Sequence, residues 1–213
     1  MEIQINPTRM ELNRLKGRLT MAQRGHKLLK DKRDELMRKF LELIRENKDL
    51  RISVEEKLSR SFANFLLAQA VMSGETMEEA IMFPQARVEL DVEEKNLMSV
   101  RVPQFIQQHQ EDESGDVYPY GFANTSAELD TSIAALAEVL PQVIKLAEVE
   151  KAVSLLADEI DKTRRRVNAL EHVLIPQLIS TIKYISMKLD EAERSSLVRL
   201  MKIKDIVRGE EVG

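Results

Sequence analysis

The sequence LNRLKGRLTMAQRGHKLLKDKRDELMRKFLELIRENKDL, residues 12–50, decides the fold. Apolar residues recur in it at alternating steps of three and four. Leucine fills five of the six second positions of this repeat: Leu15, Leu29, Leu36, Leu43 and Leu50. A period of 3.5 residues held over more than five heptads is typical of a coiled coil. The sequence therefore predicts a long helix with a narrow apolar seam.

A second stretch, closer to the C-terminus, has the same period. Eight of its nine seam positions are apolar: Leu146, Val149, Val153, Leu156, Ile160, Thr163, Val167, Leu170 and Leu174. Two helical arms of similar length, joined by an insert, pair most simply with each other. We therefore expect an all-α-dominated fold, in which a long antiparallel two-helix coiled coil forms a rod.

Capping residues mark the predicted start of each arm. Thr8 with Glu11, and Thr125 with Glu128, have the spacing of a capping box. In such a box the hydroxyl and the carboxylate each accept a hydrogen bond from a backbone N–H at the start of the helix. Both arms should therefore begin at defined residues.

Glycine and proline residues suggest where the helices end or bend. Gly74 or Pro84 could end the first arm, and we favour Pro84 because the residue before a proline is forced out of helical geometry. Pro141 and Pro176 lie inside the second arm, where each removes a backbone donor, so kinks or local unwinding are expected there. The predicted parts are a first coiled-coil arm at 1–83, an insert at 84–124 and a second coiled-coil arm at 125–213.

The insert changes period. Apolar residues alternate with polar ones at Val88, Leu90 and Val92, and again at Met98, Val100 and Val102. Alternation of this kind predicts a small β-hairpin, with its turn in the charged stretch 93–96. Because an isolated hairpin is marginal in water, it should rest on the arms or on a cluster of Phe105, Tyr118, Tyr120 and Phe122. The acidic stretch 110–116 is expected to be a loop.

Matching the ends of the two arms also predicts their register. Residues that face each other should have numbers that add up to about 210, in steps of seven. Leu36 would then meet Leu174, and His26 would meet Tyr184. Polar residues in the seam would fix this register, as in the predicted pair of Asn47 with Thr163.

Composition excludes several classes of protein. The 213 residues include no Cys, no Trp and only nine aromatic residues, while 32% are charged, which suits long solvated helices better than a bulky globular core. Without cysteine there is no disulfide framework, and no apolar run is long enough to span a membrane. We therefore expect a cytoplasmic protein with neither a signal peptide nor direct membrane insertion.

No catalytic or cofactor motif stands out. There is no glycine-rich phosphate loop, and His26, His109 and His172 have no metal-site spacing. At this density of charge, the carboxylates are best explained as solvated helix faces. We therefore expect no enzyme activity, no cofactor and no metal in this chain.

What remains is interaction surface. Residues 8–39 hold eleven Lys/Arg against four Asp/Glu, so one end of the predicted rod is basic. Three consecutive arginines lie off the seam of the second arm, and two apolar residues with nearby basic ones lie off the seam of the first. We predict that these side chains bind a partner: Met21, Arg24, Lys27, Leu28, Arg164, Arg165 and Arg166. The alternative for the arginines is a solvated basic patch.

Three stretches of the chain carry a family resemblance: residues 6–40, residues 146–178 and the sequence VEEKNLMSVRVP at 92–103. They resemble the two signature arms and the hairpin insert of the D subunit of the V-type (V/A-type) rotary ATPases. The match covers both ends and the middle of the chain. Residues 51–83, residues 106–124 and the tail after Lys204 contain no motif of that family that we can assign.

The resemblance implies a role as central rotor shaft. In that family the terminal ends of the two arms enter the catalytic hexamer of A and B subunits, and the F subunit attaches on the side. The insert end points towards the membrane rotor, which it reaches through the d-type adaptor, also called the C subunit. The chain would then be a non-catalytic component, peripheral to the membrane, that couples ATP hydrolysis or synthesis to rotation and to H⁺ or Na⁺ transport.

Two other classes of function are compatible with a coiled coil. A basic arm could bind nucleic acid, but it lacks interleaved aromatic residues for base stacking and the chain as a whole is acidic. We therefore expect no nucleic-acid partner. A generic coiled-coil adaptor would explain the heptads, but not the hairpin insert.

Overall fold

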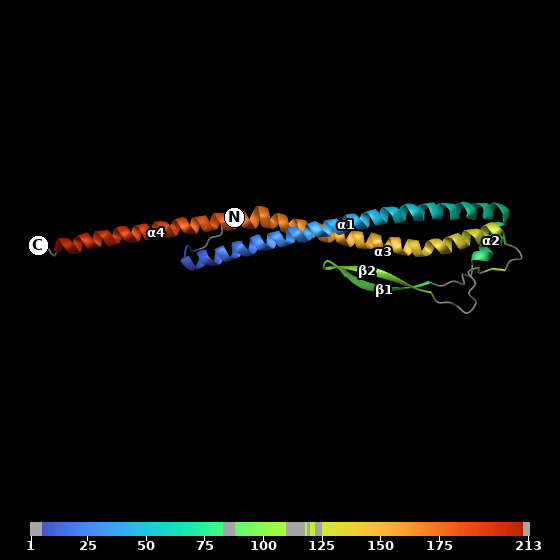
Figure 1. Ribbon diagram of the computed structural model, residues 1–213, viewed down its shortest axis with the longest axis horizontal. Helices are drawn as coiled ribbons and strands as arrows, with labels where there is room; N and C mark the ends of the chain where they lie inside the picture. Colours follow the sequence, from blue (N-terminus) through green and yellow to red (C-terminus); the bar gives the residue numbers. More distant parts are fainter. Residues whose placement is uncertain (1–5, 83–87, 110–117, 119, 122–124, 211–213) are drawn as a thin grey trace. The chain divides into compact units, whose positions relative to one another are not determined.

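The computed structural model describes residues 6–82, 88–109, 118, 120–121 and 125–210. Its elements are α1 (Arg9–Val71), α2 (Gly74–Ile81), β1 (Val88–Leu97), β2 (Val100–His109), α3 (Ala127–Ala169), a π-helix η1 (Leu170–Leu174) and α4 (Ile175–Glu210) (Figure 1). Long helices and one two-stranded antiparallel sheet confirm the predicted fold class. No helix in the described part of the chain is long and apolar enough to cross a membrane.

The chain divides into two compact units. The terminal unit comprises Met1–Glu35 and Asp161–Gly213, and the central unit comprises Leu36–Ile160. In each unit, a segment of α1 runs antiparallel to a segment from the second half of the chain. Each unit has its own apolar core and is described by itself below.

In the terminal unit, the start of α1 packs against α4. The buried core consists of Leu15, Ala22, Leu178 and Ile185, with half-buried Leu12, Leu19, Ile175, Ile182 and Leu189 around it. His26 contacts Glu171 at 3.3 Å, and Arg9 pairs with Glu193 near the start of α1. The apolar seam predicted for the first arm is therefore the face that α1 buries here.

The π-helix η1 lies immediately before Pro176. The backbone N–H of Ile175 bonds to the carbonyl of Leu170, five residues earlier, which is one residue more than in an α-helix. This wider turn takes up one extra residue between the seam positions Leu170 and Ile175. Leu174, predicted as a seam residue, is instead 41% exposed. The predicted unwinding is confirmed at Pro176, whereas α3 continues through Pro141 as an α-helix.

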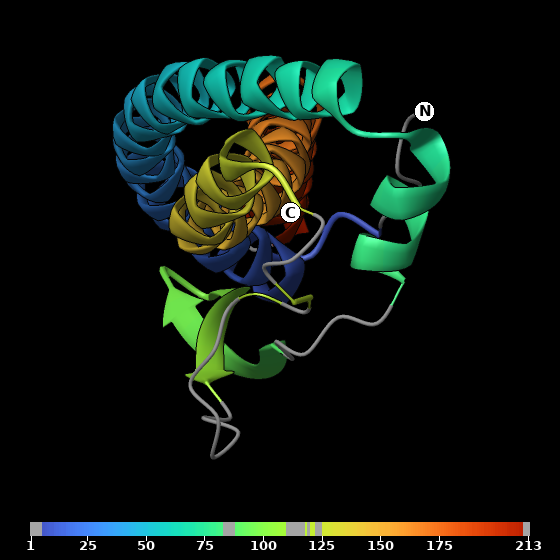
Figure 2. The same ribbon diagram turned by 90° about the vertical axis from the view of Figure 1, so that its right-hand side faces the viewer.

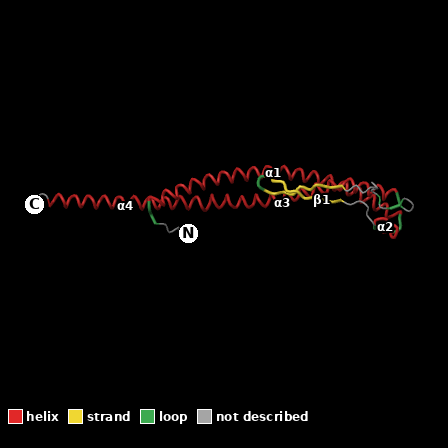
Figure 3. Tube along the Cα trace, turned by 90° about the horizontal axis from the view of Figure 1, so that it is seen from below, coloured by secondary structure: helices red, strands yellow, loops and turns green. Residues whose placement is uncertain are grey.

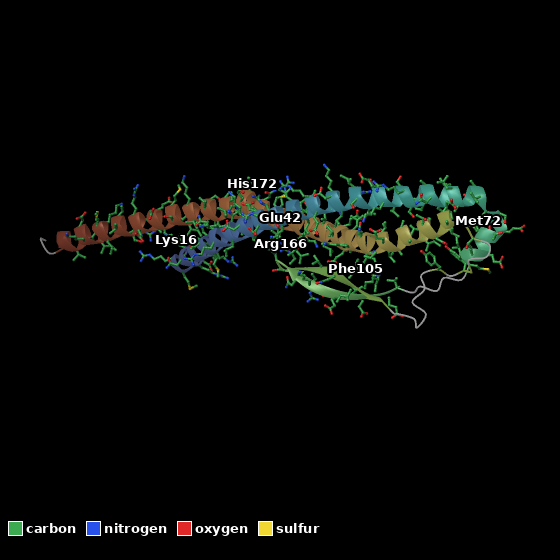
Figure 4. All side chains as sticks on the ribbon, turned by 45° about the vertical axis from the view of Figure 1, so that its right-hand side comes forward. Lys16, Glu42, Met72, Phe105, Arg166 and His172 are labelled. Carbon is green, nitrogen blue, oxygen red and sulfur yellow. The ribbon has the colours of Figure 1, made fainter. Side chains whose placement is uncertain are left out.

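In the central unit, the hairpin lies against the helices (Figures 1 and 2). Val100 and Val102 of β2 are buried with Leu36 of α1 and with Ala152, Leu156 and Ile160 of α3. The backbone N–H of Phe105, which is labelled in Figure 4, donates to the Glu148 carboxylate at 3.2 Å. Of the two predicted supports for the hairpin, the helices are the one that the structure confirms.

The turn of the hairpin differs from the prediction. β1 continues through the charged residues, and the two-residue turn is Met98–Ser99, both with positive φ (54° and 70°). The Asn96 side chain accepts a hydrogen bond from the backbone N–H of Ser99 at 2.9 Å. Two positive φ values favour Gly or Asn in such a turn, so the sequence Met98–Ser99 carried no recognisable signal.

The first helix ends earlier than predicted. α1 stops at Val71, and Ser73 caps the short helix α2, accepting from the backbone N–H of Thr76 at 3.3 Å. Pro84, the favoured end, lies outside the described residues. The core at this end joins α1, α2 and the start of α3 through Ala68, Met77, Ala80 and Leu129 (Figure 2). Met72, labelled in Figure 4, packs against the same core.

The predicted register is wrong. In the central unit, Leu36 packs with Leu156 and Ile160, which precede Leu174 by 18 and 14 residues. In the terminal unit, His26 contacts Glu171, and Tyr184 is 55% exposed. The prediction placed the end of α1 at Pro84, 13 residues beyond Val71, and this error displaced every pair by about two heptads.

One of the two predicted caps is also wrong. Thr8 accepts a hydrogen bond from the backbone N–H of Glu11 at 3.2 Å, which confirms it as the cap of α1. The Glu11 carboxylate, however, contacts Arg14. At the second helix, Ser126 accepts from the N–H of Leu129 at 3.4 Å, so the cap lies one residue after the predicted Thr125.

Candidate partner-binding surfaces

The three arginines of the terminal unit are exposed on α3. They lie between Thr163 and Val167, both buried, so the helical spacing turns all three away from the seam. Arg165 contacts Asp161, one turn earlier on the same helix, at 2.5 Å. Among the described residues, Arg164 and Arg166 have no ion-pair partner, and both can therefore face an acidic surface.

The four predicted residues of α1 are exposed as well. Met21 is 76% and Leu28 is 69% exposed, and they lie seven residues apart, so they share one face of the helix. Arg24 and Lys27 are exposed between them. Within the described chain, no hydrogen bond or ion pair joins these residues to Arg164, Arg165 or Arg166.

The last part of α4 is a surface that the sequence analysis missed. After Glu193, which pairs with Arg9, α4 continues past the start of α1 (Figure 3). We call residues 194–207 the C-terminal segment, and every one of them is exposed. Half of its fourteen residues are large and apolar: Leu197, Val198, Leu200, Met201, Ile203, Ile206 and Val207.

These apolar side chains surround the helix. Helical spacing distributes the seven residues around the whole circumference instead of on one face. A helix that is apolar all round is normally buried. The segment also carries Arg194, Arg199, Lys202 and Lys204 against one acidic residue, Asp205. It therefore fits an enclosing partner that is apolar within and acidic at its edge.

A second surface that was missed lies on α1 in the central unit. The outer face of α1, meaning the face away from the buried Ser61 and Ala68, contains a shallow hollow. The hollow is lined by Ile52, Glu55, Glu56, Ser59, Arg60 and Ala63. Further along α1, four large apolar side chains are exposed: Phe62, Leu66, Leu67 and Val71.

A signal for both missed surfaces was present in the sequence. The run LSRSFANFLLAQAV at 58–71 contains one charged residue, in a chain that is 32% charged. Two paired helices need only one apolar face each, so apolar residues all round an arm indicate further contacts. The heptad positions alone did not show this, because they describe only the seam between the arms.

The end of the central unit is acidic and partly apolar. On α2, Glu75, Glu78 and Glu79 are exposed, and Met82 directly after the helix is 68% exposed. Tyr120 anchors this end: its hydroxyl donates to Asp130 at 2.7 Å, and burial together with this bond raises the pKa of the Tyr120 phenol. The phenol therefore stays neutral and keeps its proton for the bond.

The site geometry is that of binding surfaces. Within the described residues, no group of three or more His, Asp or Glu side chains is placed to hold a metal ion. The side chains that stand out are exposed apolar and basic ones in the terminal unit, and exposed apolar and acidic ones in the central unit. Such surfaces bind other proteins by charge complementarity and apolar burial.

Comparison with known proteins gives consistent matches. A family model described as the D subunit of ATP synthase matches residues 11–205. The chain is 57% identical to the D subunit of the V-type ATP synthase of Clostridium novyi (strain NT) over 210 residues, 98% of this chain and 97% of that protein. It is 58% identical to the protein of the same name from Acetivibrio thermocellus over 205 residues, 96% of this chain and 92% of that protein. The corresponding protein from Clostridium botulinum (strain ATCC 19397 / Type A) is also 58% identical, over 208 residues, 97% of this chain and 96% of that protein.

Proposed function

The chain belongs to the family of ATP synthase D subunits and is a central-stalk component of a V-type ATP synthase, and from this we propose that its terminal unit turns inside the catalytic hexamer. In this role the chain is the rotor shaft. It couples ATP hydrolysis or synthesis in the surrounding A and B subunits to rotation, and thereby to ion transport in the membrane sector. The nucleotide chemistry belongs to those subunits, so this chain is non-catalytic.

The observation that carries the proposal is the C-terminal segment. Its seven exposed large apolar residues surround one helix that has no neighbour within the described chain. Burying such a side chain contributes roughly 1.5 to 3 kcal/mol, so an enclosing apolar ring would stabilise the complex considerably. A ring also suits rotation, because apolar contacts all round a helix favour no single angular position.

The exposed basic residues support contact with the same hexamer. Arg164, Arg165, Arg166, Arg24 and Lys27 are all exposed in the terminal unit. We propose that they face acidic side chains of the A and B subunits, with Met21 and Leu28 packed between them. Exposed charge pairs are individually weak, so they can break and re-form as the shaft turns.

The two surfaces of the central unit fit the other proposed partners. We assign the F subunit to the outer face of α1, where Phe62 and Leu66 are 56% and 63% exposed beside the hollow. We assign the d-type adaptor of the membrane rotor, the C subunit, to the acidic end at α2. The chain would then sit on the cytoplasmic side, peripheral to the membrane, without entering it.

Binding of purified partner proteins tests this assignment. In one variant, Leu197→Ser and Met201→Ser remove apolar surface from the C-terminal segment; a matched control carries Phe62→Ser and Leu66→Ser in the central unit. The first variant should bind the A and B hexamer at least tenfold more weakly and keep its affinity for the F subunit. The control should show the opposite pattern. Equal effects of both variants on both partners would contradict the proposal.

A further inference from the structure

A pair of serines joins the two helices inside the central unit. Ser61 of α1 and Ser132 of α3 are both fully buried. The Ser61 hydroxyl donates to the backbone carbonyl of Ser132 at 3.0 Å, and the Ser132 hydroxyl donates to the carbonyl of Ser61 at 3.1 Å. The two bonds are reciprocal, and each links a side chain of one helix to the backbone of the other.

This arrangement requires small side chains on both helices at the same level. A serine hydroxyl reaches the opposite backbone only where the two helices approach closely, and a bulky residue on either side would hold them apart. The buried positions one heptad away are Val54 on α1, at 3% exposure, and Val139 on α3, at 2%. Ser61 and Ser132 therefore form a small polar layer next to a branched apolar one.

The leucine and valine layers do not fix the register by themselves. They repeat every seven residues, so sliding one helix by a heptad places apolar residues opposite apolar residues again. The same slide separates the two serines and brings Ser61 level with Val139, or Ser132 level with Val54. The branched side chain then blocks the close approach, and both hydroxyls stay buried without their partners, which is costly.

We propose that Ser61 and Ser132 form a register lock, a buried polar layer that prevents α1 and α3 from sliding past each other by whole heptads. The lock is a property of the chain itself and is tested on the free protein. Its failure would leave the proposed function untouched, and the reverse also holds. In a shaft, sliding of one helix along the other would absorb motion that should be transmitted, and the lock opposes it.

Cysteine cross-linking reads the register directly, because the chain contains no native cysteine. Asn47 and Leu146 lie two heptads from the serines, and Lys145 contacts Glu46 beside them at 3.6 Å. Asn47→Cys with Leu146→Cys therefore reports the observed register. Asn47→Cys with Val153→Cys, or with Val139→Cys, reports a slide of one heptad in either direction.

The test compares these reporters with and without the serines. Ser61→Ala with Ser132→Ala keeps the helices, because alanine has the higher helix propensity, and circular dichroism verifies this. The matched control, Val54→Ala with Val139→Ala, removes apolar volume from the neighbouring layer and leaves both hydroxyls in place. It is read with the Asn47→Cys, Val153→Cys pair.

With the serines present, we expect the slid pairs to cross-link at least tenfold less than the observed-register pair. In the serine double variant, at least one slid pair should cross-link five times more than before, while the control should not change. An unchanged cross-linking pattern in the serine variant would overturn the lock. An equal rise in the valine control would also overturn it, because general loosening would then explain the slide.

Discussion

Arg165 differs from its two neighbours, because it is the arginine of the triplet that has an ionic partner in its own helix. Its contact with Asp161 joins two exposed side chains, at 79% and 51% exposure, so it adds little to the stability of the helix. Arg164 and Arg166, at the same surface, have no such contact in the described chain. Three adjacent positive charges repel one another, and an acidic partner relieves that repulsion.

The first prediction concerns these three arginines. Reversing Arg164, Arg165 and Arg166 to glutamate should leave folding nearly unchanged, since exposed charges seldom contribute more than about 1 kcal/mol. Against an acidic hexamer, attraction becomes repulsion, which can cost several kcal/mol. We expect normal circular dichroism, weaker and more salt-sensitive hexamer binding, and ion pumping reduced more than ATP hydrolysis. Unchanged affinity at all salt concentrations together with normal pumping would mean that the arginines are merely solvated.

At the scale of elements, the sequence predicted most of the helical seam and the presence of the hairpin. All twelve seam positions of the first arm, from Leu12 to Leu50, are buried or half-buried. Periodicity reports which face of a helix is buried, and that information is local. The end of α1, the turn at Met98–Ser99 and the register depend on contacts between distant residues, and these were the predictions that failed.

The candidate site was predictable in part for the same reason. Being off the seam follows from spacing, so the exposure of Met21, Leu28 and the three arginines could be predicted. The C-terminal segment could not, because its exposure follows from the register: α4 lacks a neighbour after Glu193 only when α1 ends at Val71. A helix end misplaced by 13 residues therefore concealed the largest apolar surface of the terminal unit.

A second prediction concerns the π-helix η1, which we attribute to one extra residue in the seam and to Pro176. Deleting Val173, which is 51% exposed, restores regular spacing but presses the ring of Pro176 against the carbonyl four residues earlier. The melting temperature should therefore fall by several degrees, in line with a cost of up to about 3 kcal/mol. Adding Pro176→Ala should return the melting temperature to the parent value or above it.

Thermal unfolding followed by circular dichroism checks this prediction, with Pro176→Ala alone as the control. The single substitution should change the melting temperature little, because the extra residue still requires a π turn. If the deletion alone stabilises the protein as much as the double change does, then the proline plays no part in forming η1.

At the scale of the whole molecule, the two units carry opposite charge. The terminal unit contains 20 Lys/Arg against 13 Asp/Glu, and the central unit contains 12 against 23. The net charges are therefore +7 and −11, which together give the −4 of the chain. Overall acidity thus conceals a basic unit, and it is the basic unit that we assign to the catalytic hexamer.

The last prediction separates what charge does from what apolar surface does in that assembly. Long-range attraction mainly raises the rate of association, whereas close apolar contacts mainly slow dissociation. Raising the ionic strength from about 0.01 to 0.1 M shortens the Debye length from roughly 30 to 10 Å. We expect the association rate with the hexamer to fall about tenfold or more over this range, and the dissociation rate to change much less.

The variant with Leu197→Ser and Met201→Ser should behave in the opposite way. Both positions are more than half exposed in the C-terminal segment, and the substitutions leave every charge in place. Encounter with the hexamer should therefore proceed at the parent rate, while dissociation becomes at least tenfold faster because the enclosed apolar contacts are lost. Stopped-flow mixing of labelled chain and hexamer measures both rates. If salt and the serine substitutions change the same rate constant, then charge and apolar surface do not act at separate stages, and the division of roles within the terminal unit is wrong.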